Sequence, residues 1–456
     1  MYRLSMATVG LLTLFTAACA RYEPDARLPD VRADISTRTG LDLPAELQAS
    51  PTPFSGELSP DTAARMALQF NPNLHAALED LNVASAREVQ AGLLVNPTLG
   101  GTVLFEEDGV RPTLDFGLGF ELGRLLTRGR RMKLTTAERE QVEAEATEAI
   151  IQTMAEARAA ATALWAADLR LALLREIVTV RTAAANAAEV LSTAGNFTAG
   201  DLAMHRRALV QSRFALGQAE LARIDALEAL SNVTGTIITA DSSVELTKAP
   251  ETSNDPAAFV KTAIENSLSL KAERKRIEAF GIQVGLANVS VWLDGLEAEA
   301  AFEREEDETA AGFGAALSLP IFDGGRARTG AARAALEAAE LRYRALAFAV
   351  ANRARAILGM IEVAQTAAND LSPSLLAQTD NEFDFQERQL NGMQIGPLAL
   401  LAAKDTLLTN QIAAVDMQQL WALAGIQADA LKAGVVINTL PDMAPLAAND
   451  SNEEAH

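Results

Sequence analysis

The sequence has few of the residues that build catalytic and metal centres. It contains one cysteine and three histidines in 456 residues. The histidines, His75, His205 and His456, lie far apart, and none is at metal-ligand spacing from another histidine or from the cysteine. The sequence also lacks a phosphate-binding glycine loop with a lysine, a zinc-protease helix motif and a nucleophile elbow. We therefore expect a protein that is not an enzyme and that has no cofactor and no metal site.

Aromatic residues are also scarce, at 5% of the chain, whereas alanine is abundant and long stretches contain neither glycine nor proline. This composition favours long helices that pack closely through small side chains over a thick, aromatic-rich globular core. The formal net charge of −21 argues against nucleic acid, or an anionic membrane surface, as a partner of the chain.

Residues 1–18 have the pattern of a secretory signal peptide. Arg3 supplies the positive start, and the apolar run 7–18 is too short to span a bilayer. The small residues Thr16-Ala17-Ala18 directly precede Cys19 and resemble a bacterial lipoprotein cleavage box, in which the cysteine becomes the acylated first residue. The resemblance implies a lipid anchor at Cys19. The alternative is ordinary cleavage nearby, with Cys19 lost or left as a free thiol.

The rest of the chain is an internal duplication with an offset of 195–196 residues. Three anchors keep this offset: Gly129-Arg130 with Gly325-Arg326, Gly200-Asp201-Leu202 with Gly396-Pro397-Leu398, and Asn71 with Asn266. Chance matches among glycines are common, but a nearly constant offset over so much of each copy is not. We therefore expect two copies of one structural unit.

Each copy contains two segments in which apolar and polar residues alternate, as in a strand with one apolar and one polar face. In the first copy these are residues 99–105 and 114–122, joined by a polar turn at 106–109; in the second they are 296–303 and 312–319, joined by an acidic loop at 305–308. Strands of about 8–10 residues suit a tilted bilayer crossing. With the apolar face towards lipid, the pore-facing acidic residues would be Asp115, Glu121, Glu297 and Glu299. A soluble antiparallel sheet packed on helices would show the same alternation.

Long helices follow the strands in both copies. Residues 126–194 contain no proline and only Gly129, so one helix of about 70 residues, about 105 Å long, is predicted. The second copy predicts a similar helix over 326–395, kinked or interrupted at Pro373. Shorter return helices are expected over 201–232 and 398–432, continued by helical segments at 60–95 and 257–289. Heptad-spaced apolar residues predict coiled-coil packing: Leu164, Leu171, Val178, Leu336, Tyr343, Val350 and Ile357.

The order and spacing of these features resemble the TolC-like outer-membrane efflux factors, the exit ducts of tripartite pumps. The resemblance covers nearly all of residues 60–432. Its specific segments are Leu319-Pro320-Ile321-Phe322-Asp323-Gly324-Gly325-Arg326, Asn391-Gly392-Met393-Gln394-Ile395-Gly396, Leu400-Leu401-Ala402-Ala403-Lys404 and Phe197-Thr198-Ala199-Gly200-Asp201-Leu202. The family implies a mainly α-helical fold with membrane β-strands: a long periplasmic helical barrel, a 12-stranded β-barrel shared by a homotrimer, and an equatorial band, here residues 233–256 and the segment after Lys432.

The resemblance also implies a domain order and partners. Residues 1–18 would be the signal peptide, 19–59 a lipid-anchored linker, 60–256 and 257–432 the two efflux repeats, with strands at about 98–122 and 291–319, and 433–456 a tail. A periplasmic adaptor would dock at tips near 195–201 and 391–398, through Phe197, Gly200, Gly392 and Gly396. An inner-membrane pump, of the resistance-nodulation-division type, would supply small toxic solutes, metal ions or drugs, for export across the outer membrane.

Many members of the family narrow the channel near the tip with a ring of acidic residues. Asp201 and Asp405 are the candidate gate residues here, although the family's Leu-Asp-Ala pattern reads Leu401-Ala402-Ala403 in this chain. The other interpretation of both aspartates is a solvated charge at a helix end. For the whole chain, the alternative function is a lipid-anchored periplasmic coiled-coil scaffold or adaptor without a channel.

Overall fold

The computed structural model describes residues 22–44, 53–105, 113–246, 255–305 and 308–437. They divide into two compact units, each of which draws on both sequence repeats: one from within 1–33, 76–147 and 268–348, the other from within 34–75, 148–267 and 349–456. Cys19, the signal peptide and the turn at 106–109 lie outside the described residues. Among the described residues, no helix has the length and apolar character needed to cross a membrane.

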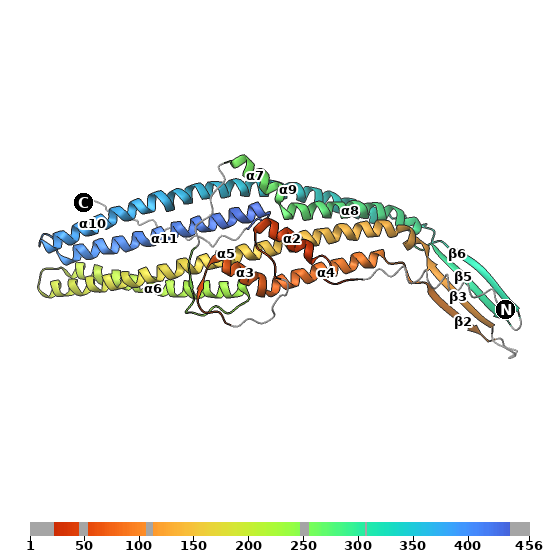
Figure 1. The fold of residues 1–456 in the computed structure, drawn as a ribbon, viewed down its shortest axis with the longest axis horizontal. Coiled ribbons are helices and arrows are strands. Elements are labelled where there is room, and N and C mark those ends of the chain that lie inside the picture. Colours follow the sequence, from red (N-terminus) through yellow and green to blue (C-terminus); the bar gives the residue numbers. More distant parts are fainter. Residues whose placement is uncertain (1–21, 45–52, 106–112, 247–254, 306–307, 438–456) are drawn as a thin grey trace. The chain divides into compact units, whose positions relative to one another are not determined.

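The first unit contains a four-stranded antiparallel sheet of two hairpins (Figure 1). Its strands are β2 (Thr98–Leu104), β3 (Thr113–Glu121), β5 (Glu297–Glu305) and β6 (Glu308–Ala316), in the order β2-β3-β5-β6. The hairpins join through β3 and β5, where Phe116 lies opposite Phe302. The predicted hairpins are thus confirmed. The second hairpin is shorter than the predicted range of about 291–319, because helix α8 (Leu268–Leu293) extends into that range and β6 ends at Ala316.

The long helix of the first copy is α5 (Leu122–Thr193), unbroken over 72 residues as predicted. Its counterpart is divided into α9 (Arg326–Thr366), a π-helical turn η1 (Ala367–Leu371) and α10 (Ser372–Asn391). The interruption at Pro373 is confirmed, and its cause is local. A proline has no N–H to donate, and its ring collides with the carbonyl four residues earlier in a regular helix. The wider turn avoids this collision, and the Ser372 N–H bonds to the Ala367 carbonyl five residues back.

The return helices are α6 (Ala199–Thr234) and α11 (Pro397–Ala433), close to their predicted limits. The expected continuous segments 60–95 and 257–289 are each two helices: α3 (Pro60–Phe70) with α4 (Pro72–Gly92), and α7 (Pro256–Asn266) with α8. Asn71 breaks the first pair because it precedes a proline, which disfavours the helical region for it; its ψ is 117°. In the second unit, β1 (Glu57–Leu58) pairs in parallel with β4 (Ser243–Val244), within the predicted equatorial segment 233–256.

Alanine side chains form much of the buried contact between helices in the second unit. Leu164 is fully buried in a cluster with Ala157 and Ala161 of α5, and with Ala63 and Ala67 of α3. Small side chains let these backbones approach closely, as the composition predicted. Among the predicted heptad positions, four are buried: Leu164, Leu171, Val350 and Ile357.

The two glycine anchors of the repeat differ in conformation. Gly129 lies within α5, whereas Gly325 is left-handed, at φ 69°, and directly precedes α9. In the first copy the helix begins immediately after β3. In the second copy Pro320 stands in the corresponding stretch and disfavours a helical conformation of Leu319. The stretch 317–325 is therefore extended or turn-like, and a side chain at Gly325 would collide with Val291. The family-like segment Leu319–Arg326 is confirmed as the strand-to-helix junction.

Candidate functional site

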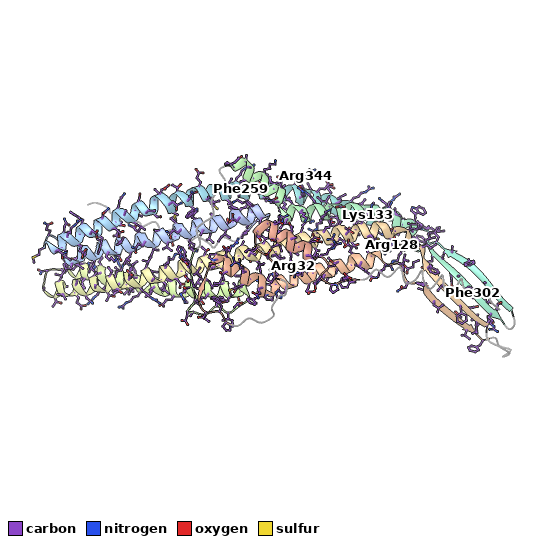
Figure 2. The ribbon with its side chains drawn as sticks, in the orientation of Figure 1. Arg32, Arg128, Lys133, Phe259, Phe302 and Arg344 are labelled. Carbon is purple, nitrogen blue, oxygen red and sulfur yellow. The ribbon has the colours of Figure 1, made fainter. Side chains whose placement is uncertain are left out.

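The sheet has one apolar face that is open to its surroundings. The register places Leu114, Phe116, Leu118 and Phe120 on the same face as Phe302, which is labelled in Figure 2. Large side chains on this face are exposed: Phe313 by 92% and Leu99 by 77%. A soluble sheet packed on helices would bury this face. In the described residues it is instead the kind of surface that lipid covers.

The opposite face is acidic and rich in glycine. It carries all four predicted pore-facing residues, because Asp115, Glu121, Glu297 and Glu299 alternate with the apolar set. Glu121 lies directly opposite Glu297. Like charges in directly opposed positions destabilise a sheet. The arrangement is therefore unfavourable for packing and suits a face in contact with water and cations.

Two further features of the acidic face concern Glu303 and Glu299. Glu303 lies opposite Asp115 on the same face and was not among the predicted pore residues, although the alternation of its strand already indicated its side. The Glu299 carboxylate lies over Gly117, where any side chain would collide with it. Glycine at this position thus makes room for the carboxylate.

The two helical tips are built alike. After α5, Gly195 is left-handed at φ 78° and the Asn196 N–H bonds to the Leu191 carbonyl. After α10, Met393 takes the left-handed position at φ 55°, and the Gln394 N–H bonds to the Gln389 carbonyl. Both bonds reach five residues back, which closes the helix in the same way.

The tip geometry corrects the register of the repeat. Thr198 caps α6 and Gly396 caps α11, so the copies correspond at an offset of 198 in the tips, not 196. Gly200 is consequently in the first turn of α6 and is not the counterpart of Gly396. Sequence reasoning also missed Met393, which is 94% exposed at the tip; its signal was its alignment with Gly195 at the corrected offset.

The predicted adaptor-docking residues all lie at these tips. The Phe197 ring stacks on the His205 ring, with 5.9 Å between centroids. Gly392 ends α10, and its N–H bonds to the Arg388 carbonyl. Gly396 precedes Pro397, the first residue of α11. Whether an adaptor docks here stays a prediction.

The two candidate gate aspartates each have a local partner. Asp201 forms a capping box with Thr198, and hydrogen bonds from the Thr198 hydroxyl and then from its backbone N–H lower the pKa of Asp201. Asp405 receives two hydrogen bonds from Arg181, at 2.8 and 3.0 Å. The gate therefore stays a prediction for both, and these contacts describe a helix cap and a helix-to-helix ion pair.

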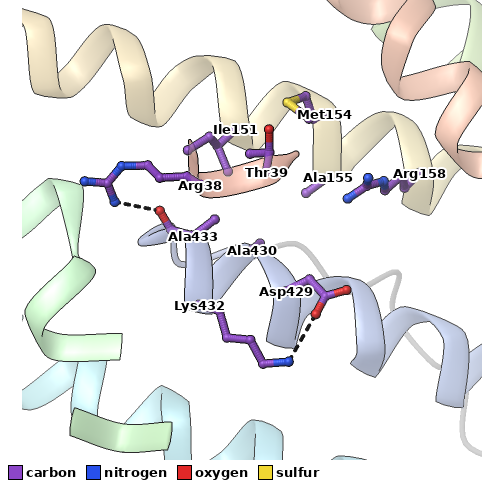
Figure 3. Close-up of a pocket in the computed structure, with 10 residues that line it drawn as sticks. All are labelled: Arg38, Thr39, Ile151, Met154, Ala155, Arg158, Asp429, Ala430, Lys432 and Ala433. Carbon is purple, nitrogen blue, oxygen red and sulfur yellow. Dashed lines mark hydrogen bonds and ion pairs between the residues drawn. The ribbon is translucent and has the colours of Figure 1, made fainter. Parts of the chain in front are cut away.

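A small cavity of about 220 Å³ in the second unit is lined by Arg38, Arg158, Asp429 and Lys432 (Figure 3). Arg38 donates to the Ala433 carbonyl at 2.9 Å, Arg158 pairs with Asp61, and Lys432 pairs with Asp429. Because these charged side chains already have partners within the protein, we interpret the cavity as part of the helix packing and not as a ligand site. Among the described residues, no group of three or more histidine, cysteine or acidic side chains is placed to hold a metal ion.

No family model and no curated protein sequence matches the chain. Solved structures do match it. The outer-membrane channel CmeC of Campylobacter jejuni is 15% identical, with a TM-score of 0.68, over 92% of this chain and 93% of that one. The outer-membrane protein VceC of Vibrio cholerae is 21% identical, with a TM-score of 0.60, over 83% and 96%. The outer-membrane channel MtrE of Neisseria gonorrhoeae is 15% identical, with a TM-score of 0.53, over 83% and 89%.

These similarities extend over most of both chains, and they confirm the predicted TolC-like fold. In the single chain the four strands form an open sheet, with β2 and β6 at its edges. At identities of 15–21%, the similarity is one of fold.

Proposed function

We propose that the chain is the outer-membrane exit duct of a tripartite efflux system, a passive homotrimeric channel for small toxic solutes such as metal ions or drugs. The sheet carries this proposal. It combines an exposed apolar face with an acidic, glycine-rich one. Strands β3, β5 and β6 have nine residues each, the length of a tilted bilayer crossing. Such a surface fits a wall between lipid and water.

The open edges of the sheet support a trimer. An unpaired strand edge cannot remain in lipid, because each unsatisfied backbone group there costs several kcal/mol. Four strands from each of three chains give a closed wall of twelve strands. In this arrangement β6 of one chain pairs with β2 of the next, and the acidic faces line the lumen.

Helix α6 gives a second argument for self-association. Residues on one side of it repeat at alternating spacings of four and three, which is the pattern of a coiled-coil contact. The apolar members of this set, the α6 seam, are exposed in the single chain: Ala203, Val210, Phe214, Leu221 and Ile224. Phe214 is 70% exposed and Val210 65%. An apolar stripe of this regularity matches the helix of a second copy in a helical barrel.

The partners follow from the same architecture. The tips at 195–198 and 392–396 would receive a periplasmic adaptor, and an inner-membrane pump of the resistance-nodulation-division type would load the duct. Acylation of Cys19 would anchor each chain to the outer membrane. Asp201 and Asp405 are proposed as the gate on the strength of their position near the tips, with Arg181 as the residue that must release Asp405.

Reconstitution of the Cys19→Ala protein tests this function against the alternative of a lipid-anchored scaffold without a channel. A channel inserts through its strands, so the variant is expected to remain resistant to carbonate extraction from membranes and to conduct ions in planar bilayers. A scaffold anchored only by lipid would be released from membranes and would give no conductance. That second result would overturn the proposal.

A further inference from the structure

The start of α5 is strongly basic in an acidic protein. The chain has a net charge of −21, yet residues 122–137 contain five basic residues and no acidic ones. The basic residues are Arg124, Arg128, Arg130, Arg131 and Lys133. Figure 2 shows Arg128 and Lys133 on the helical side of the sheet, near the ends of its strands. The net charge, which argued against an anionic membrane surface, is therefore reversed locally.

The basic segment is packed directly beneath the strands. The Gly123 N–H bonds to the Leu296 carbonyl, immediately before β5, at 3.1 Å. Gly123 also lies against the Leu293 carbonyl at the end of α8, so closely that no side chain would fit. The start of α9 joins them, because Arg328 bonds to Asp294 and to Ser290 of α8, both at 3.0 Å. The starts of α5 and α9 thus both pack against the end of α8, at the ends of the strands.

The charges here are only partly neutralised within the chain. Arg130 and Lys133 are exposed, and neither they nor Arg326 forms an ion pair with an acidic side chain in the part of the chain that the structure describes. Burial lowers the pKa of Arg131, and the positive charge of Arg124 lowers it further. Like charges crowded together in this way favour an anionic partner.

Exposed apolar side chains lie on α5 and next to the starts of β5 and α9. Leu126, Arg130 and Lys133 are at positions i, i+4 and i+7 and so share one face of α5. Trp292 at the end of α8 is 61% exposed, Ile321 74%, and Phe322 fully exposed. Tryptophan and other apolar side chains next to lysine and arginine form the arrangement that sits at the level of lipid headgroups. The basic stretch from Arg124 to Lys133 rises about 14 Å, which covers a headgroup layer of roughly 5–8 Å.

We propose that this surface, the basic collar of Arg130, Lys133 and Arg326, binds the phosphates of anionic phospholipids in the leaflet that borders the helices. The inference rests on the proposed function, because it needs the sheet to lie in a bilayer. The phospholipids would hold the trimer at a fixed depth: the aromatic and aliphatic side chains enter the boundary of the acyl chains, and the guanidinium and ammonium groups contact the phosphates.

The experiment compares the full-length wild-type protein with the triple variant Arg130→Gln, Lys133→Gln, Arg326→Gln. Both are reconstituted in phosphatidylcholine vesicles with and without phosphatidylglycerol, and the phosphatidylglycerol retained after detergent extraction is counted by native mass spectrometry. The wild type is expected to retain phosphatidylglycerol in preference to phosphatidylcholine. In the triple variant the ratio of retained phosphatidylglycerol to phosphatidylcholine should fall at least tenfold. Each surface cation increases the affinity for an anionic lipid surface by about fivefold at low salt. A matched control, Arg206→Gln, Lys261→Gln, Arg355→Gln, removes the same charge away from the sheet and should keep the preference.

Two outcomes would overturn the proposal: an unchanged lipid preference in the collar variant, or equal displacement of bound phosphatidylglycerol by inorganic phosphate at millimolar concentration, which would mark a site for a free anion. Conductance in pure phosphatidylcholine bilayers separates this proposal from the channel function. The collar variant should still conduct there. A wild-type protein that does not conduct would contradict the channel function. The lipid-retention measurement tests only the basic collar.

Discussion

Asn71 and Asn266 make the same hydrogen bond in the two halves of the chain. The Asn71 side-chain amide donates to the Val233 carbonyl at 2.7 Å, and the Asn266 amide donates to the Lys432 carbonyl, also at 2.7 Å. Each asparagine ends a short helix, and each acceptor lies near the end of the return helix of its own repeat. The duplication detected in the sequence is therefore also a duplication of a specific contact.

This contact leads to a prediction about stability. Asn71 is buried, and its side-chain oxygen also accepts from the Asn73 N–H at 2.8 Å. Replacing it leaves the partly buried Val233 carbonyl without its donor, so Asn71→Ala should lower the apparent free energy of unfolding by about 1–3 kcal/mol. Thermal unfolding followed by circular dichroism measures this. Asn73→Ala, at an exposed neighbour, should change stability by less than about 0.5 kcal/mol. Equal effects of the two substitutions would contradict the role of Asn71.

The Arg181–Asp405 ion pair should stabilise the helix packing. Its side chains are 29% and 27% exposed and share two hydrogen bonds. A double-mutant cycle with Arg181→Ala and Asp405→Ala should give a coupling free energy of about 1–2 kcal/mol. The same cycle on Arg206 and Glu189, whose side chains are 57% and 58% exposed, should give less than about 1 kcal/mol. Single-channel recording of Asp405→Ala then tests the gate: unchanged conductance and selectivity would count against a gate at this residue.

The capping box at Asp201 should make the tip sensitive to acid. The pKa of Asp201 is lowered in the folded state by its bonds to Thr198. A depressed pKa stabilises the fold above the pKa of the unfolded chain, and this contribution is lost as the pH falls through the folded value. The amide-exchange protection of Asp201 and Leu202, whose N–H groups bond to Thr198, should therefore decrease, after correction for intrinsic rates, as the pH falls below about 4. Thr198→Ala should already have low protection at pH 5. Protection that is independent of pH would contradict the cap.

The α6 seam predicts a dependence of the trimer on one aromatic side chain. Phe214→Gln should shift native mass spectra from trimer to monomer, because the ring is 70% exposed in the single chain and would be buried only between copies. Arg213→Gln introduces the same side chain at the next residue, turned about 100° around the helix, and should leave the trimer intact. A trimer that tolerates Phe214→Gln would exclude the seam as the contact between copies.

The sequence predicts the regular elements well because their periods are visible in it. Alternation located both hairpins, and the absence of proline located α5. Pro373 marked an interruption, but its π-helical form depends on backbone hydrogen bonds that no sequence pattern shows. The predicted offset between the two tips was wrong by two residues. The left-handed position is Gly195 in the first copy but Met393 in the second, so no glycine marks it there. The pairing of Arg181 with Asp405, 224 residues apart, depends on how distant helices pack together.

Bilayer recording with the acidic face as the variable tests the central claim most directly. Under a potassium chloride gradient, the wild-type reversal potential should show cation selectivity. In the proposed trimer the acidic face of the sheet would line the lumen in three copies, with Asp115, Glu121, Glu297, Glu299 and Glu303 on that face. The double variant Glu297→Gln, Glu299→Gln should conduct with reduced cation preference, while Glu265→Gln, an exposed carboxylate on α7, should behave as the wild type. Anion preference, or no conductance from correctly assembled trimers, would contradict the account.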